Sequence, residues 1–235
     1  MLHPLIFRLL EAKRALGFRK LLWVLPRRLV RQDFLVLMKD LRLPLPEVPS
    51  HDSLQWTGLT EGDISRVCAI NPRVSGAEIR RRLDEGQECR LCWIGGSLVH
   101  YRWETTRPAY LPFLGKTLWP LKGDIHVTEV FTHPAFRGRD IHSFSSRMAQ
   151  YRFKHLGFTR SIAVVASWNA PSLRVTWEKS GFALAGTVGY RNVGLGRYYF
   201  ATGDVCLDRD GGMYVRPCLS AADQARSAVE DRPHV

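Results

Sequence analysis

Long apolar runs are missing from this sequence. Near its start the longest uninterrupted run is Leu21–Leu25, whereas a helix that crosses a bilayer needs roughly 20 consecutive apolar residues. Arg8 also precedes any long apolar stretch, which differs from the pattern of a secretory signal peptide. We therefore expect no transmembrane helix and a cytoplasmic protein.

Cysteine is scarce as well. The five cysteines are an odd number and lack the spacing of a disulfide framework. Cys89 and Cys92 are three residues apart in an alternating segment, and side chains at that spacing on a strand point to opposite faces. No second pair follows at the spacing of a zinc finger. We interpret the two as buried thiols of a reduced protein and predict no metal site.

Acidic residues are too few to balance the basic ones. The 235 residues include 34 Lys and Arg but 22 Asp and Glu, which gives a formal net charge of +12 and a pI near 9.9. This excess favours an anionic partner, namely nucleic acid, an acidic membrane surface or a phosphorylated ligand. Residues 1–32 hold eight basic residues and one acidic residue, Glu11, so they contribute +7 of the charge.

The pattern of residues 1–32 predicts two short basic amphipathic helices. Leucines recur there at helical spacing, and Pro26 interrupts the second run. Such helices either cover an apolar patch on their own domain or lie peripherally on an anionic surface, such as the inner face of the membrane. The segment has few aromatic or Gly-rich features for stacking on bases, and we expect no nucleic-acid partner.

The remainder of the chain predicts one domain in which strands and helices alternate. Its 45% hydrophobic content suffices for one large core. We expect an α/β (α+β) fold with a mixed sheet at 33–207, after the extension at 1–32 and before a flexible tail at 208–235. The expected elements are a strand at 33–41, a Pro-rich linker at 44–50, helices at 60–69 and 75–85, a hairpin at 87–105, a long loop at 106–123, a strand at 125–132, a helix from 141, a strand at 160–166, a short helix at 169–180 and two strands around 194–196.

A basic loop joins the strand at 125–132 to the helix that follows it. The loop contains Arg137, Gly138 and Arg139. A strand that ends in such a turn before a helix presents backbone N–H groups and the positive end of the helix dipole. Glycine lets the backbone approach a ligand closely, and arginine adds bidentate contacts. The loop therefore predicts a phosphate site.

Two segments resemble the GNAT superfamily of N-acyltransferases. The string VFTHPAFRGRDIHSFSSRM at 130–148 resembles the acyl-CoA-binding motif of that family, Arg/Gln-x-x-Gly-x-Gly/Ala between a strand and a long helix. The string NAPSLRVTWEKSGF at 169–182 is similar to the family's Asn-containing segment that ends in Gly-Phe. The resemblance covers roughly 54–207, and it implies a GNAT-like, mostly antiparallel central sheet flanked by helices.

The resemblance implies an acyltransferase that uses acyl-CoA, such as acetyl-CoA, as co-substrate and holds no permanent cofactor. The strands near 125–132 and 162–166 would separate and admit the pantetheine arm. An amine would then attack the thioester carbonyl, and the acceptor would be a small molecule or a glycan or lipid precursor near a membrane. The donor-binding residues implied are Phe131, Arg137, Gly138, Arg139, Asp140, Ile141, His142 and Asn169.

Three residues depart from the family pattern. Asp140 stands where the family has its first glycine, and a carboxylate there competes with a pyrophosphate for the same N–H groups. His142 stands at the second small residue and adds bulk. Trp177 replaces a tyrosine that often protonates the leaving thiolate, and an indole N–H has no accessible acid chemistry. Tyr190 and Tyr151 are the other candidate acids.

Glu129 is the predicted general base. Regular alternation places it on one strand face with Ile125 and Val127, where partial desolvation would raise the pKa of its carboxyl group. A competing interpretation is an ion pair with an arginine such as Arg102. His126 and His133 are further candidates.

Two other functions stay open at the level of sequence. One is a non-catalytic GNAT-like binding or scaffold protein, for which Asp140, His142 and Trp177 would mark a lost donor site. The other is an acyltransferase whose donor is an acyl-carrier protein, which shares the pantetheine arm but lacks the adenosine diphosphate. The sequence also leaves open whether two chains form a homodimer through their last strands.

Overall fold

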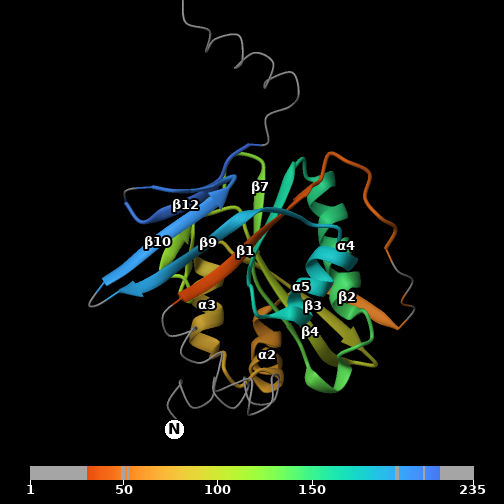
Figure 1. The fold of residues 1–235 in the computed structure, drawn as a ribbon. Helices are drawn as coiled ribbons and strands as arrows, with labels where there is room; N and C mark the ends of the chain where they lie inside the picture. Colours follow the sequence, from red (N-terminus) through yellow and green to blue (C-terminus); the bar gives the residue numbers. More distant parts are fainter. Residues whose placement is uncertain (1–30, 49–50, 52, 194–195, 209, 218–235) are drawn as a thin grey trace, which may run out of the picture.

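The computed structural model of the protein describes residues 31–48, 51, 53–193, 196–208 and 210–217 (Figure 1). The basic helices predicted within 1–32 therefore lie outside the described residues, except for the last two positions, and so does the predicted tail beyond 217. Within the described part of the chain, no helix is long and apolar enough to cross a membrane.

A large mixed sheet forms the centre of the molecule (Figure 1). Among the described residues it has eight strands in the order β10-β9-β1-β8-β7-β4-β3-β2. Neighbouring strands are antiparallel except for β7 and β8, which run parallel. The strands are β1 (Arg31–Asp40), β2 (Leu54–Gly58), β3 (Glu88–Ile94), β4 (Ser97–Thr105), β7 (Asp124–Thr132), β8 (Arg160–Ala166), β9 (Ala183–Val193) and β10 (Gly196–Gly203). This arrangement confirms the predicted sheet, although β2 was not among the predicted strands.

β1 occupies the middle of the sheet because its sequence is apolar on both faces. Phe34 lies opposite Ala166 of β8 and Val188 of β9. Val36 points to one face of the sheet and is fully buried, and Leu37 packs in a separate cluster with Val165. A strand covered on both faces shows this near-continuous apolar run rather than strict alternation.

Helices cover both faces of the sheet (Figure 1). α2 and α3 pack on one face against Leu91, Tyr101 and Trp103, and α4 packs on the other. Ser75 accepts a hydrogen bond from the backbone N–H of Glu78 and caps α3, which lies where a helix was predicted at 75–85. The helical segments are η1 (Glu61–Asp63), α2 (Ile64–Ile70), α3 (Gly76–Asp84), η2 (Pro134–Phe136), α4 (Ile141–His155), α5 (Ala170–Leu173) and the π-helical η3 (Arg174–Lys179).

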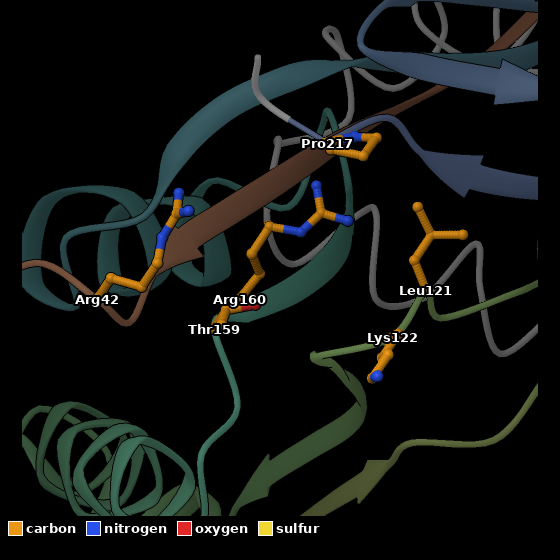
Figure 2. A pocket seen from close by; sticks show the side chains of 6 residues that line it. All are labelled: Arg42, Leu121, Lys122, Thr159, Arg160 and Pro217. Carbon is orange, nitrogen blue, oxygen red and sulfur yellow. The ribbon is translucent and has the colours of Figure 1, made fainter. Parts of the chain in front are cut away.

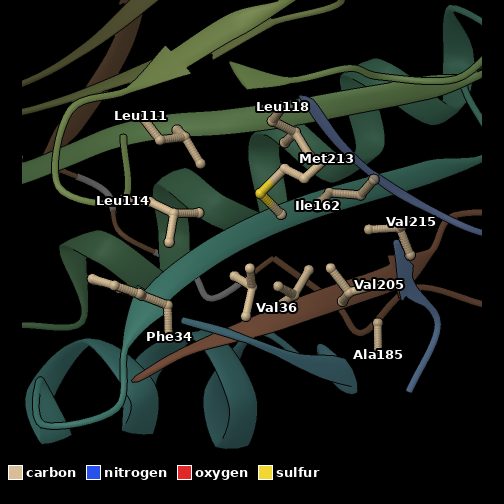
Figure 3. Close-up of a cluster of buried hydrophobic side chains, with 11 residues drawn as sticks. Phe34, Val36, Leu111, Leu114, Leu118, Ile162, Ala185, Val205, Met213 and Val215 are labelled. Carbon is tan, nitrogen blue, oxygen red and sulfur yellow. The ribbon is translucent and has the colours of Figure 1, made fainter. Parts of the chain in front are cut away.

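A second, smaller sheet replaces what the sequence predicted as a loop and part of a tail. The segment 106–123 contains two strands, and residues from 208 onward include a further one. Met213 and Val215 are fully buried there, beside Leu114 and Leu118, against the β1 side of the large sheet (Figure 3). The strands are β5 (Ala109–Leu111), β6 (Lys116–Leu118), β11 (Val205–Leu207) and β12 (Gly212–Val215), in the order β11-β12-β6-β5.

The prediction of irregular structure failed here because these strands are short. Three- and four-residue strands that pair with distant partners leave no periodic pattern in the sequence. Leu111, Leu114 and Leu118 of this segment fill a core, whereas Tyr110 and Trp119 are exposed.

Arg160, at the start of β8, links the large sheet to the small one. Nε of Arg160 lies 2.6 Å from Oδ1 of Asp124, and both side chains are buried. The same guanidinium donates to the backbone oxygens of Val215 and Arg216. A small cavity beside it is shown in Figure 2. Its lining residues are Arg42, Leu121, Lys122, Thr159, Arg160 and Pro217.

Candidate active site

The two parallel strands separate halfway along their length. β7 and β8 pair from Asp124 and Arg160 as far as Val127 and Ala163. Beyond that point β7 stays paired with β4, and β8 stays paired with β1. Within the described chain no strand pairs with the facing edges of 128–132 and 164–166. The backbone oxygens of Thr132 and Ala166 accept from Arg137 and Asn169, and the remaining groups on these edges can pair with an extended ligand.

A bulge in β7 decides where Glu129 points. Trp103 of β4 lies opposite Glu129, but the next residue, Glu104, lies opposite Val127, so Thr128 is the extra residue. The bulge reverses the alternation, and Glu129 therefore does not share a face with Val127. Val127 packs with the cluster of Leu37, whereas Glu129 lies on the face covered by α2 and α3. The predicted face was wrong because a bulge leaves no mark in an alternating pattern.

Both carboxylate oxygens of Glu129 accept hydrogen bonds. Oε2 lies 2.6 Å from Nη1 of Arg82, and Oε1 accepts from the hydroxyl of Tyr101 at 2.6 Å. Asn71 in turn donates to that hydroxyl at 2.7 Å, and the guanidinium of Arg82 lies over the ring of Trp103. The side chain of Glu129 keeps 28% of its surface exposed, so it is not sealed off from solvent.

The ion-pair interpretation of Glu129 is confirmed in kind, but its partner differs. Arg102 forms a buried pair with Glu104 instead, at 2.8 Å on the opposite face of β4. Arg82 comes from the run Arg80-Arg81-Arg82 on α3, and only the packed structure shows which of the three turns inward. Burial and the charge of Glu129 raise the pKa of Tyr101. The phenol therefore stays protonated and serves as a donor to Glu129.

The basic loop ends in two left-handed residues. Gly138 has φ +79° and Asp140 has φ +54° and ψ +15°. Asp140 is the one described residue other than glycine with positive φ. Asparagine and aspartate tolerate this conformation better than other L-residues. Asp140 therefore takes the backbone shape that a glycine would take, and the turn is preserved despite the substitution.

The first turn of α4 is open to an anion. The side chain of Asp140 makes no capping hydrogen bond to the helix; it forms an ion pair with Lys179 at the end of η3. The first N–H groups of a helix lack intrahelical partners, so those that follow Asp140 point out of the helix end. Arg137 and Arg139 are exposed on the same loop.

His142 does not obstruct the loop as its bulk suggested. Its ring lies 5.9 Å from the ring of His100, which is fully buried beneath α4. Loss of solvation and the nearby Arg102 lower the pKa of His142 to about 3. The ring is therefore neutral at pH 7 and turned toward the protein.

The other predicted acids and bases lie elsewhere. His126 is fully buried, and burial lowers its pKa to about 3, so it cannot exchange protons with a ligand. His133 packs edge-on against Phe136 in the loop. Tyr151 donates to the backbone oxygen of Leu45, and Tyr190 stacks with Tyr199 on the β9-β10 hairpin.

The segment at 169–182 follows β8, and its end lies against α4. Asn169 caps α5 by accepting from the backbone N–H of Ser172 at 3.3 Å. Trp177 lies in the π-helical η3 and is 45% exposed, but exposure does not give an indole acid chemistry. The donor-binding roles predicted for Asn169, Phe131 and the loop residues stay predictions.

The two closely spaced cysteines are buried in different clusters. Cys89 packs with α2 and α3, and Cys92 packs on the α4 face. Burial raises the pKa of both thiols, that of Cys92 to about 12. The prediction of opposite faces is confirmed, and neither thiol is poised to act as a nucleophile.

The fold is that of the GNAT N-acetyltransferases. A structure from Novosphingobium aromaticivorans DSM 12444, assigned to the GNAT family of acetyltransferases, matches with a TM-score of 0.50 and 19% identity, over 68% of this chain and 62% of that one. The GCN5-related N-acetyltransferase from Sphaerobacter thermophilus matches with a TM-score of 0.53 and 13% identity, over 80% of this chain and 58% of that one.

The likeness is one of fold. This chain spans less than two thirds of the length of either structure. No protein-family model and no curated protein sequence matches it. At such low identity the shared architecture does not transfer a substrate, so any proposal on function rests on the residues around the separated ends of β7 and β8.

Proposed function

We propose that this protein transfers an acyl group from acyl-CoA, such as acetyl-CoA, to an amine. One observation carries the proposal: the strands β7 and β8 separate directly beside a basic, uncapped helix N-terminus. The separated edges offer hydrogen bonds to the amides of a pantetheine arm, and the loop from Arg137 to Ile141 offers N–H groups and cations to a diphosphate.

The reaction follows from this placement. The acceptor nitrogen attacks the thioester carbonyl, and the C–S bond of the tetrahedral intermediate then breaks. The amine proton passes to Glu129, directly or through a water molecule, when the carboxylate releases one of its two donors. The thiolate takes its proton from solvent, because Trp177 at the expected acid position cannot supply one.

Binding of the donor is the first test. Calorimetric titration of the purified protein with acetyl-CoA, longer acyl-CoAs and an acyl-carrier protein compares the donors directly. We expect micromolar affinity for CoA thioesters. Binding of the carrier protein alone would favour the carrier-dependent enzyme, and silence with every donor would contradict acyl transfer.

A non-catalytic binding protein is the second candidate, and Trp177 is the observation that favours it. A non-catalytic protein would bind CoA but transfer no acyl group. A thiol-release assay with acetyl-CoA and a panel of primary amines separates the two functions, because steady CoA release above the rate without protein requires catalysis.

The membrane part of the proposal rests on residues 1–32, of which 1–30 lie outside the described structure. An acceptor on a glycan or lipid precursor, and peripheral attachment to the inner face of the membrane, would both follow from their charge of +7. Cosedimentation of the full chain and of a chain lacking 1–30 with anionic vesicles tests this part. Equal partitioning of the two proteins onto the vesicles would contradict membrane attachment through residues 1–30.

A further inference from the structure

Asp140 and Lys179 form an ion pair between the basic loop and η3. Asp140 ends the basic loop and Lys179 ends η3, so the pair links the segment that follows β7 to the segment that follows β8. The side chains remain 53% and 44% exposed, respectively. The pair is therefore open to the solvent, where a ligand at the start of α4 can reach it.

The position of Lys179 is fixed by contacts of its own backbone. Nη2 of Arg147 donates to the backbone oxygen of Lys179 at 2.9 Å, and Nε2 of Gln150 donates to that of Ser180 at 3.0 Å. Both donors belong to α4. The end of η3 is thus held against the helix whose N-terminus is open, and the ammonium group is held beside that N-terminus.

The pair resolves the electrostatic conflict at the loop. A lone carboxylate at Asp140 would repel a phosphate that approaches the N–H groups of α4. Lys179 neutralises this charge, and an ammonium group has three N–H donors, so donors remain for a second anion. Arg137, Arg139 and Lys179 against Asp140 leave a net charge of +2 at the site.

We propose that Lys179 is a donor-binding residue, and that its ion pair with Asp140 cancels the repulsion of that carboxylate and so adapts the loop to a diphosphate. This inference rests on the proposed function. A net charge of +2 matches the two charges of the CoA diphosphate better than the single charge of the phosphodiester on a carrier protein. Asp140, which stands where the family has a glycine, is then part of a working donor site. The donor is then CoA rather than an acyl-carrier protein.

The test is a set of calorimetric titrations with CoA. We compare the wild type with Lys179→Ala, Asp140→Gly, the double variant, and Lys122→Ala as a control for loss of an exposed lysine, located beside Arg160 at the other end of β7 and β8. We expect Lys179→Ala to weaken CoA binding about tenfold or more, because it removes a cation and leaves Asp140 uncompensated. Asp140→Gly should bind CoA at least as tightly as the wild type. The CoA affinity of the double variant should lie between those of the two single variants.

Donor analogues locate the effect. The loss in Lys179→Ala should persist with 3′-dephospho-CoA, which keeps the diphosphate, and should vanish with pantetheine, which has no phosphate. Far-UV circular dichroism and thermal melts of each variant confirm folding, and glycine accepts the positive φ at position 140 without strain.

The outcomes separate this inference from the proposed function. If the wild type fails to bind CoA, both are overturned. If the wild type binds CoA and Lys179→Ala binds it as tightly as Lys122→Ala does, acyl-CoA binding stands and the role of Lys179 is overturned. An equal loss of affinity for pantetheine in Lys179→Ala would also contradict the role of Lys179, because the lysine would then not act through the phosphates.

Discussion

At the scale of single residues, the proposed function depends on how two carboxylates are held. Glu129 receives hydrogen bonds from Arg82 and Tyr101, so its charge is stabilised on the face of the sheet that an acceptor would approach. Asp140 is held by Lys179 at the start of α4. Under the proposed function, Glu129 would take the amine proton, and the ion pair of Asp140 would leave a cation for the donor.

Replacement of Glu129 by glutamine tests its role as base. We expect kcat for acyl transfer to fall by about 10²-fold, because positioned general bases contribute roughly that factor. CoA binding should change by less than about twofold, because the residue lies on the acceptor face. Initial rates and calorimetry check the two quantities.

Glu88→Gln provides the matched control for that experiment. Glu88 forms a surface ion pair with Arg152 at the same 2.6 Å separation as that of Glu129 and Arg82. Its loss should leave kcat unchanged. A kcat for Glu129→Gln as high as that of the control would exclude Glu129 as the base.

At the scale of elements, a bulge and a short strand have the largest consequences. The bulge at Thr128 moves Glu129 to the face of α2 and α3, and β7 and β8 separate at the same level. Bulges bend a strand and change the direction of its side chains, and they recur beside active sites. β12 has a different role, because it seals the core beneath the small sheet (Figure 3).

Met213 provides the test of β12. Its side chain is fully buried, so Met213→Ala should lower the free energy of unfolding by about 2–5 kcal/mol. Tyr214→Ala on the same strand should cost clearly less, because Tyr214 is partly exposed. Urea denaturation measures both. Equal stability of Met213→Ala and the wild type would mean that residues 208–217 are a flexible tail after all.

At the scale of the whole molecule, three histidines are held neutral by the fold. His100 and His126 are fully buried, and burial lowers the pKa of both, as it does for His142. In the unfolded chain a histidine has a pKa of about 6.5. Below that pH the unfolded state binds more protons than the folded state, so the free energy of unfolding falls as the pH falls.

We predict that the free energy of unfolding falls by about 1.4 kcal/mol for each histidine between pH 7.5 and pH 5.5. Urea denaturation at the two pH values measures it. Burial raises the pKa of Glu104, so this residue changes the free energy of unfolding in the opposite direction as the pH falls. The decisive comparison is therefore between the wild type and His126→Gln, because both proteins contain Glu104. We expect a loss smaller by about 1.4 kcal/mol in the variant; the same loss in both proteins would show that His126 is not held neutral.

Local pattern sufficed for the elements whose signals lie within the elements themselves. The cap at Ser75, the Gly95-Gly96 turn and the apolar run of β1 each act through neighbours in the chain. The helix, the hairpin and the strand were therefore predictable without tertiary information. The phosphate-type turn at Gly138 was predictable for the same reason, because backbone conformation is a local property.

The sequence by itself determined the alternation of strands and helices, the basic turn before α4 and the residues gathered there. Only the tertiary structure decided that Thr128 is bulged, that Arg82 rather than Arg102 holds Glu129, and that Lys179 forms an ion pair with Asp140. The physical reason is range. Turns and caps form between residues a few positions apart, whereas the direction of a side chain and its ionic partner depend on contacts between segments that only folding brings together.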